Sequence, residues 1–119
     1  MKKEYEKILR KVKKDYDRCC AVTGRHDTTL IGSHIFPRGA YPQFKNLYCN
    51  ILPVIQSIDQ LIEYSDSDLK IMRNPFQRIL LISRLVKLYD GPFIDQVLRQ
   101  LNELCIVLRE YKKIHGCYR

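Results

Sequence analysis

Long apolar segments are missing from this chain of 119 residues. No stretch approaches about eighteen uninterrupted apolar residues, the length at which a membrane-spanning helix is expected. The first segment, MKKEYEKILRKVKKDY, is charged throughout, whereas a secretion signal carries an apolar core. These absences exclude a membrane-spanning helix and predict a soluble protein that is not exported and stays in the cytoplasm.

Cysteine pairs at the spacing of a metal site are also missing. The five cysteines form no C-x-x-C pair, their number is odd, and two of them are adjacent. This usage is typical of a reducing cytoplasm and argues against a disulfide scaffold. Cys19 or Cys20 with Cys49 would lack convincing third and fourth zinc ligands, so structural zinc is not expected. Cys105 and Cys117 fall in the predicted C-terminal helix and tail.

Internal repeats, low-complexity segments and interdomain linkers are absent as well. The length suffices for one modest hydrophobic core and is too short for two. We therefore predict a single α+β domain over residues 1–119, mostly helical. It divides into a basic N-terminal helix (1–18), a central strand–strand–helix unit (19–64) and C-terminal helices (65–119).

Basic residues outnumber acidic ones, with 21 Lys and Arg against 13 Asp and Glu and a formal net charge of +8. This excess attracts a polyanion at a distance, and nucleic acid is the leading class of partner. The alternative is a charge that only keeps the protein in solution. Composition leaves both interpretations open, so a binding site must decide between them.

Helical periodicity marks the N-terminal segment. Its apolar residues recur three and four positions apart, at Tyr5, Ile8, Leu9, Val12 and Tyr16. The pattern predicts an amphipathic helix over residues 2–17 with a basic outer face. That face either contacts phosphates or is simply solvated.

Between residues 19 and 53 the helical period disappears. Short β-rich pieces (CCAVT, TLIGSHI, NLYCNILP) alternate with turn residues, which predicts a short hairpin followed by a long loop. The helical period returns over residues 54–64. The SDSD sequence at 65–68 then predicts a turn or the N-cap of a short helix.

Two longer helices are predicted near the C-terminus. Pro75 opens the run FQRILLISRLVKLY, the Asp90-Gly91-Pro92 sequence breaks it, and FIDQVLRQLNELCIVLREYKKIH continues as a long amphipathic helix. We expect the two helices to form an antiparallel pair. The apolar residues of this pair form either core or the surface of a homodimer: Leu80, Leu81, Leu85, Leu88, Val97, Leu101, Leu104 and Leu108.

Four polar residues of the central unit have the chemistry that phosphodiester hydrolysis needs. The reaction requires a base for water, a cation for the charge on the phosphate, and a group that orients the base. His34 suits the base, because imidazole titrates near neutral pH. Asn50, Asp59 and Glu63 could supply the rest. Asp59 and Glu63 are four residues apart, so on a helix they lie on one face and could share Mg²⁺.

Three stretches of the central unit resemble the HNH endonuclease family, also called the ββα-metal or His-Me finger family: CAVTG, LIGSHIFPRG and NILPVIQSIDQLIE. The resemblance covers residues 19–64 and implies a ββα-metal unit. It implies that His34 is the general base, that Asn50 orients this base or contacts the metal, and that Asp59 is a metal ligand. Glu63 falls where some members place a further ligand.

Two positions depart from the family pattern. Asp59 replaces the last motif histidine and gives an H-N-D variant, and a carboxylate suits Mg²⁺ or Mn²⁺ better than zinc. Ser33 stands where many members have an acidic or histidine ligand, and a hydroxyl is a weaker one. The implied metal ligands are therefore Asp59, Glu63 and Ser33, with Mg²⁺ or Mn²⁺ as the cofactor.

Other side chains are candidates for contact with DNA or for the local core. Arg38 follows the motif proline and could clamp the scissile phosphate bidentately, or be an exposed turn residue. Asn46 is the alternative to Asn50. Cys20 and Cys49 are expected in a small core beneath the loop. Further candidates for contact with the DNA backbone are Arg25, His26, Lys45, Arg78, Arg84, Lys87, Arg99 and Arg109.

Two functional hypotheses follow from the resemblance, beside a purely structural helical protein. The first is a small metal-dependent DNA endonuclease, encoded by a phage or mobile element and then located in the host cytoplasm, with branched or nicked DNA among its substrates. The second is a module that kept the fold, lost catalysis and binds nucleic acid or protein. Ser33 favours the second hypothesis, because it weakens the metal site.

Overall fold

The computed structural model describes residues 2–26, 29–39, 41–64 and 75–115. Its first helix is α1 (Lys2–Asp15), and apolar residues at helical spacing form the inner face of this helix. Val12 and Tyr16 are fully buried. The hydroxyl of Tyr16 donates a hydrogen bond of 2.8 Å to Oε1 of Gln100, which ties the end of α1 to the C-terminal part of the chain. The predicted N-terminal helix is confirmed.

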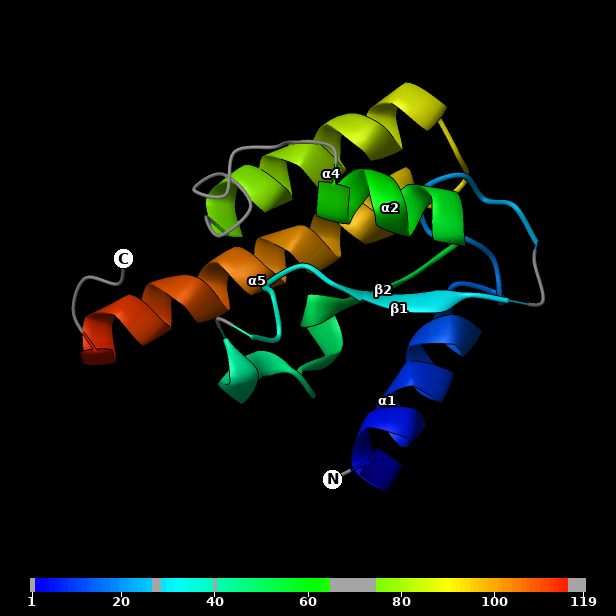
Figure 1. The fold of residues 1–119 in the computed structure, drawn as a ribbon. Coiled ribbons are helices and arrows are strands. Elements are labelled where there is room, and N and C mark those ends of the chain that lie inside the picture. Colours follow the sequence, from blue (N-terminus) through cyan, green and yellow to red (C-terminus); the bar gives the residue numbers. More distant parts are fainter. Residues whose placement is uncertain (1, 27–28, 40, 65–74, 116–119) are drawn as a thin grey trace.

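Two short strands, β1 (Ile31–His34) and β2 (Ile51–Val54), form an antiparallel sheet. In the register of this sheet His34 lies opposite Ile51. All four residues of β2 are buried, as expected for a strand with helices on both faces. Figure 1 shows this arrangement, with α1 on one side of the sheet and α2 and α4 on the other.

The loop of the central unit lies between the two strands, so the predicted order of a hairpin followed by a long loop is wrong. Within the loop are two 3-10 turns, at Pro42–Phe44 and Tyr48–Asn50. The CCAVT sequence forms no strand, and Cys19 makes only an isolated bridge to His26. Residues 21–23 form a turn instead, in which the N–H of Gly24 donates a hydrogen bond of 2.8 Å to the carbonyl oxygen of Cys20, and Gly24 has the positive φ of 75° that glycine adopts readily.

Helix α2 (Gln56–Tyr64) begins almost directly after β2 and packs against β1. Ile58 and Ile62, four residues apart, are both buried and form its inner face. The chain therefore runs strand, strand, helix over residues 31–64. The whole described structure is a compact, mostly helical α+β arrangement of four helices and this small sheet, which confirms the predicted fold class at that level.

The predicted C-terminal helices are α4 (Pro75–Tyr89) and α5 (Ile94–His115), and they pack against each other. The turn between them includes Gly91. A Cβ atom at Gly91 would lie 2.9 Å from the carbonyl oxygen of Val22, so the close approach of these segments requires glycine. The predicted SDSD turn lies outside the described residues.

The apolar residues of α4 and α5 divide between the core and the surface. Of the eight residues expected in this pair, the four on α5 are buried in the core: Val97, Leu101, Leu104 and Leu108. Leu80 and Leu88 are exposed, at 48% and 77% of their surface. The core interpretation is therefore confirmed for α5, and the homodimer stays a prediction. None of the helices in the described ranges is long and apolar enough to cross a membrane.

Candidate functional site

His34 is the last residue of β1, and its side chain is almost completely buried. Its Nε2 atom lies 2.8 Å from the carbonyl oxygen of Lys45 in the loop between the strands. A carbonyl oxygen can only accept a hydrogen bond, so Nε2 carries the hydrogen and donates it. In the neutral imidazole Nδ1 then keeps its lone pair and can accept a proton.

The ring of Tyr5 on α1 stacks against the imidazole of His34. The ring centroids are 5.5 Å apart and the planes are inclined by 20°. The Cζ atom of Arg38 lies over the Tyr5 ring, 5.8 Å from its centroid. This close approach of α1 depends on Gly32, where a Cβ atom would lie 2.7 Å from the Tyr5 hydroxyl oxygen. The candidate base is therefore held by a helix outside the segment that resembles the HNH family.

Burial lowers the pKa of His34 below its usual value near 6.5. The bond to the Lys45 carbonyl and the charge of Glu63 act in the opposite direction, and the charges of Arg38 and Arg78 add to the lowering. The net direction is down, so His34 is neutral at physiological pH. A neutral imidazole is the form that can act as a base.

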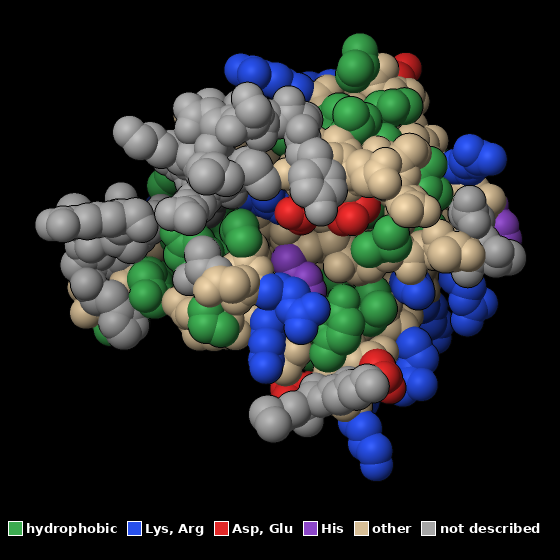
Figure 2. Space-filling model, in the orientation of Figure 1, with side chains coloured by type: hydrophobic (Ala, Val, Ile, Leu, Met, Phe, Trp, Pro, Cys, Tyr) green, Lys and Arg blue, Asp and Glu red, His purple; other side chains and the backbone are tan. Residues whose placement is uncertain are grey.

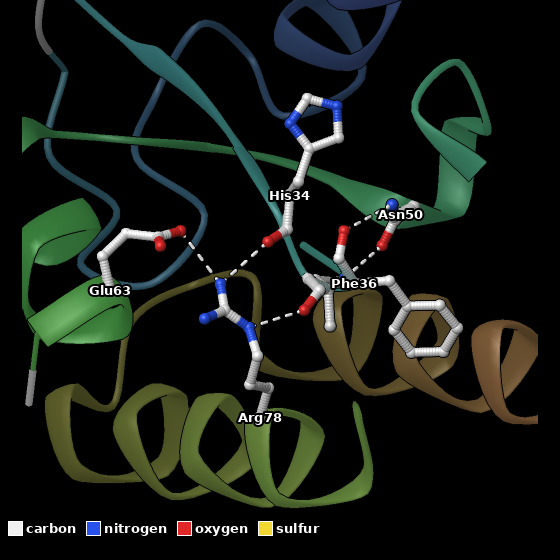
Figure 3. Close-up of polar contacts among 6 residues, drawn as sticks. His34, Phe36, Asn50, Glu63 and Arg78 are labelled. Atoms are coloured by element: carbon white, nitrogen blue, oxygen red, sulfur yellow. Dashed lines mark hydrogen bonds and ion pairs between the residues drawn. The ribbon is translucent and has the colours of Figure 1, made fainter. Parts of the chain in front are cut away.

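Asn50 fixes the loop that faces His34. It is fully buried, and its Oδ1 accepts a hydrogen bond of 2.6 Å from the backbone N–H of Phe36. Its Nδ2 donates to the carbonyl oxygens of Phe36 and Phe44, at 3.2 Å and 3.1 Å. Phe36 lies two residues after His34 and Phe44 directly precedes Lys45, so Asn50 joins the two segments that position the imidazole. Figure 3 shows its two hydrogen bonds with Phe36.

This geometry favours Asn50 over Asn46 as the asparagine of the HNH-like motif. It also favours a role for Asn50 in orienting the base over a role in contacting the metal. The Oδ1 atom of Asn50, the atom a metal would bind, is already used by a backbone N–H. The buried Oδ1 of Asn46 has no hydrogen-bond partner within the described ranges. Asn50 therefore carries the connections that Asn46 lacks.

Arg78 of α4 is buried beneath the same strand end, with 2% of its surface exposed. Its Nε donates to the carbonyl oxygen of Ile35 at 2.7 Å, and its Nη2 donates to the carbonyl oxygen of His34 at 3.0 Å. Nη2 also forms an ion pair of 2.9 Å with Oε1 of Glu63 (Figure 3). The expectation that Arg78 contacts DNA is therefore wrong, because its guanidinium is enclosed by protein groups.

Sequence reasoning missed Arg78 and Tyr5 as neighbours of His34, although a signal for Arg78 exists. Arg78 lies four residues before Ile82 and eight before Val86, and both of these are fully buried. This spacing places Arg78 on the inner stripe of α4. The Tyr5 contact had no comparable signal, because an inward aromatic on an amphipathic helix does not identify its partner.

The metal ligands implied by the family resemblance are Asp59, Glu63 and Ser33. Asp59 and Glu63 are one turn apart on α2, and neither is fully buried. The carboxylate of Asp59 has no partner in the described part of the chain, whereas Oε1 of Glu63 is held by Arg78. Ser33 has a buried Oγ without a partner among the described residues.

Two carboxylates fit Mg²⁺ or Mn²⁺, since Mg²⁺ usually keeps several waters and takes one or two carboxylates plus substrate phosphates. They do not fit zinc, for which a site built only from protein side chains needs more ligands. Among the described residues no group of three His, Cys, Asp or Glu side chains could hold a metal. The donor set therefore consists of two carboxylates, one of which Arg78 already holds.

The described cysteines are free thiols. Cys20 and Cys49 are buried in the hydrophobic core, as predicted. Burial raises the pKa of Cys49 to about 11, so this thiol stays protonated and is a poor metal ligand at neutral pH.

The surface around the site carries both signs of charge. Figure 2 shows a histidine at the centre of one face, with acidic side chains on one side of it and Lys or Arg side chains on the other. Arg38, four residues after His34, is exposed on this surface. A phosphate could therefore approach this face from solvent.

Comparisons with models of protein families, with curated proteins and with solved structures found no match. The resemblance to HNH endonucleases therefore rests on the motif residues and their spacing.

Proposed function

We propose that the protein is a metal-dependent DNA endonuclease of the HNH type, with His34 as its general base. The observation that carries this proposal is the contact between Nε2 of His34 and the carbonyl oxygen of Lys45. It fixes the tautomer in which Nδ1 has a free lone pair. A neutral imidazole in this tautomer can take a proton from the water that attacks a phosphodiester.

The imidazole is held against three kinds of partner. The loop carbonyl fixes Nε2, the Tyr5 ring covers one face, and Arg78 holds the backbone carbonyl of His34 itself. An imidazole that is already oriented loses less entropy when it takes up the proton. Asn50 acts indirectly. Its Nδ2 holds the carbonyl oxygen of Phe44, the residue before Lys45, and so fixes the loop that carries the Lys45 carbonyl.

Arg38 is the candidate for contact with the scissile phosphate. Its guanidinium is exposed, and its charge is close enough to His34 to lower the pKa of the imidazole. A guanidinium can donate two parallel hydrogen bonds to phosphate oxygens. Arg38 would thereby position the phosphorus atom for attack by the water that His34 activates.

Asp59 and Glu63 would hold the Mg²⁺ or Mn²⁺ ion, which when bound would stabilise the negative charge that develops on the phosphate. Because Arg78 already holds Glu63, it would set the orientation of this carboxylate before an ion binds. The net charge of +8 suits a DNA substrate, and contacts to phosphates would give affinity with little sequence preference. By the family resemblance, the products would be a 5′-phosphate and a 3′-hydroxyl.

A binding module without catalysis is the second candidate. The ion pair between Glu63 and Arg78 favours it, because a guanidinium already neutralises a carboxylate that the metal needs. Ser33 supports it further, since its buried hydroxyl is a weak ligand.

One experiment separates the two candidates. Plasmid and branched DNA are incubated with the wild-type protein, with His34→Ala and with His26→Ala, in Mg²⁺ or Mn²⁺. We expect cleavage by the wild type and by His26→Ala, and a loss of about 10²–10⁴-fold in His34→Ala, the usual contribution of a general base. DNA binding without cleavage by the wild type would overturn the endonuclease and support the binding module.

A further inference from the structure

Four basic residues of α1 lie on one stripe of the helix surface. Lys3, Lys7, Arg10 and Lys14 are spaced by four, three and four residues, which places them above one another on an α-helix. All four are exposed. The stripe lies opposite the face that carries Val12 into the core, so its whole length is open to solvent. We call these four residues the α1 stripe.

Acidic residues lie beside the α1 stripe: Glu4 is three residues before Lys7, Glu6 is four before Arg10, and Asp15 is next to Lys14. Lys11, beside the stripe, pairs with Asp15 at 3.1 Å. In the described part of the chain no residue of the stripe forms an ion pair. A surface hollow with a volume of about 450 Å³ continues the stripe and is lined by five cations and one acid: Arg10, Lys11, Lys13, Lys14, Arg18 and Asp15.

The dimensions of the α1 stripe suit the backbone of a nucleic acid. Lys14 is eleven positions after Lys3, so the four cations span about 16 Å at a rise of about 1.5 Å per residue. One strand of a DNA duplex presents a phosphate about every 3.4 Å along the helix axis, so several phosphates face such a stripe at once. A membrane surface fits less well, because interfacial helices need an exposed apolar face. The apolar residues of α1 are turned towards the core.

The cations of the C-terminal helices offer no comparable surface. Arg84 and Lys87 are exposed on α4, Arg99 and Arg109 are exposed on α5, and Arg78 is buried. These residues are distributed over two helices and form no single row. Figure 2 shows Lys and Arg side chains along the outer margin of the region that α1 occupies in Figure 1, beside hydrophobic and acidic side chains.

We infer that the α1 stripe binds the sugar–phosphate backbone of duplex DNA and fixes the position of the duplex relative to His34. The second half of this inference follows from the inner face of α1, where Tyr5 stacks on His34 at 5.5 Å. A duplex bound to one face of α1 is therefore connected to the candidate base through a single rigid helix. The inference rests on the proposed function for the choice of DNA as the polyanion, and it does not require cleavage.

The test measures the salt dependence of DNA binding. A short fluorescent DNA duplex is titrated with protein in EDTA, which prevents metal-dependent cleavage, at a series of NaCl concentrations. The first variant combines Lys3→Gln, Lys7→Gln, Arg10→Gln and Lys14→Gln. The matched control combines Arg84→Gln, Lys87→Gln, Arg99→Gln and Arg109→Gln, and removes the same number of charges. Circular dichroism verifies that both variants keep the wild-type helix content.

Each phosphate contact contributes about −0.9 to the slope of log K against log salt concentration. We expect the α1 variant to flatten this slope by about 3 to 4, and the control variant to change it by less than 1. Equal effects of the two variants would overturn the inference, because net charge alone would then explain binding. An unchanged slope in the α1 variant would overturn it too.

These outcomes are independent of catalysis. If the wild type cleaves no DNA but the α1 variant shows a flatter slope of log K against log salt concentration, the proposed endonuclease is wrong and DNA binding by the α1 stripe is supported. If the wild type cleaves DNA and both variants bind alike, the stripe fails and the endonuclease stands.

Discussion

At the scale of single residues, Tyr5 is the neighbour of His34 whose contribution can be removed most cleanly. Its ring stacks on the imidazole, while its hydroxyl makes only a long bond of 3.5 Å to the carbonyl oxygen of Gly32. Tyr5→Phe keeps the stack and Tyr5→Leu removes it. An aromatic pair contributes about 0.5–1.5 kcal/mol, so we expect Tyr5→Leu to lower the single-turnover cleavage rate by up to about tenfold. Tyr5→Phe should retain the wild-type rate.

Nuclear magnetic resonance gives a second measurement of the Tyr5 contact. The ring current of Tyr5 shifts the carbon-bound protons of the His34 imidazole upfield, and this shift should disappear in Tyr5→Leu and persist in Tyr5→Phe. If the His34 protons resonate at the same positions in the wild type and Tyr5→Leu, the stack does not exist in solution. That outcome would contradict the inference that α1 holds the imidazole of His34 in place.

Single residues also show the limit of the sequence. The motif spacing predicted His34 and Asn50 as partners in one site; His34 is the last residue of β1, and Asn50 directly precedes β2, whose first residue lies opposite His34. The carbonyl of Lys45 could not be foreseen, because any residue type can supply a carbonyl and sequence carries no information about it. Arg78 was expected to contact the DNA backbone, since a cation is assumed to be exposed unless its buried partners are known.

At the scale of secondary-structure elements, the packing of α1 on β1 depends on Gly32. A Cβ atom there would lie 2.6 Å from Cδ1 of Leu9 and 2.7 Å from the Tyr5 hydroxyl oxygen. We expect Gly32→Ala to push α1 away from the sheet and to lower the free energy of unfolding by about 1–3 kcal/mol, the usual cost of overpacking. Urea denaturation measures this change.

Gly39 supplies the matched control for that substitution. A Cβ atom at Gly39 would meet nothing within 4 Å, so Gly39→Ala should leave the unfolding midpoint close to the wild-type value. If Gly32→Ala and Gly39→Ala are equally stable, the close approach of α1 and β1 is absent and the stacking geometry at His34 is wrong.

The helices were predictable as elements. Two of the three predicted β-rich pieces, TLIGSHI and NLYCNILP, overlap the observed strands, but the order and pairing of the strands were not predictable. Helices α1, α4 and α5 follow from apolar residues three and four apart, a local pattern that the chain repeats over several turns. Strands β1 and β2 have only four residues each and pair across the loop that separates them. Such pairing depends on contacts distant in sequence, so short β-rich pieces such as CCAVT cannot be distinguished locally from true strands.

At the scale of the whole molecule, the candidate site is assembled from segments distant in the chain. Tyr5 comes from α1, the Lys45 carbonyl from the loop between the strands, and Arg78 from α4. Each of these segments contacts His34 at the end of β1. The net charge follows directly from the sequence, and the individual helices were predicted from it. The sequence did not predict that α1 and α4 enclose the candidate base, because amphipathic periodicity gives the inner face of a helix and not its neighbour.

The pH dependence of DNA cleavage tests most directly whether this assembled His34 is a general base. Only the neutral imidazole can accept a proton, and burial lowers the pKa of His34 below about 6.5. The single-turnover rate, measured at constant Mg²⁺ between about pH 5 and pH 8, should therefore be level above pH 6.5 and fall as the pH decreases below it. His26→Ala should keep this profile, and His34→Ala should lose both the rate and the acid limb. A wild-type rate that does not fall in acid, or an acid limb that survives in His34→Ala, would contradict the assignment of His34 as the base.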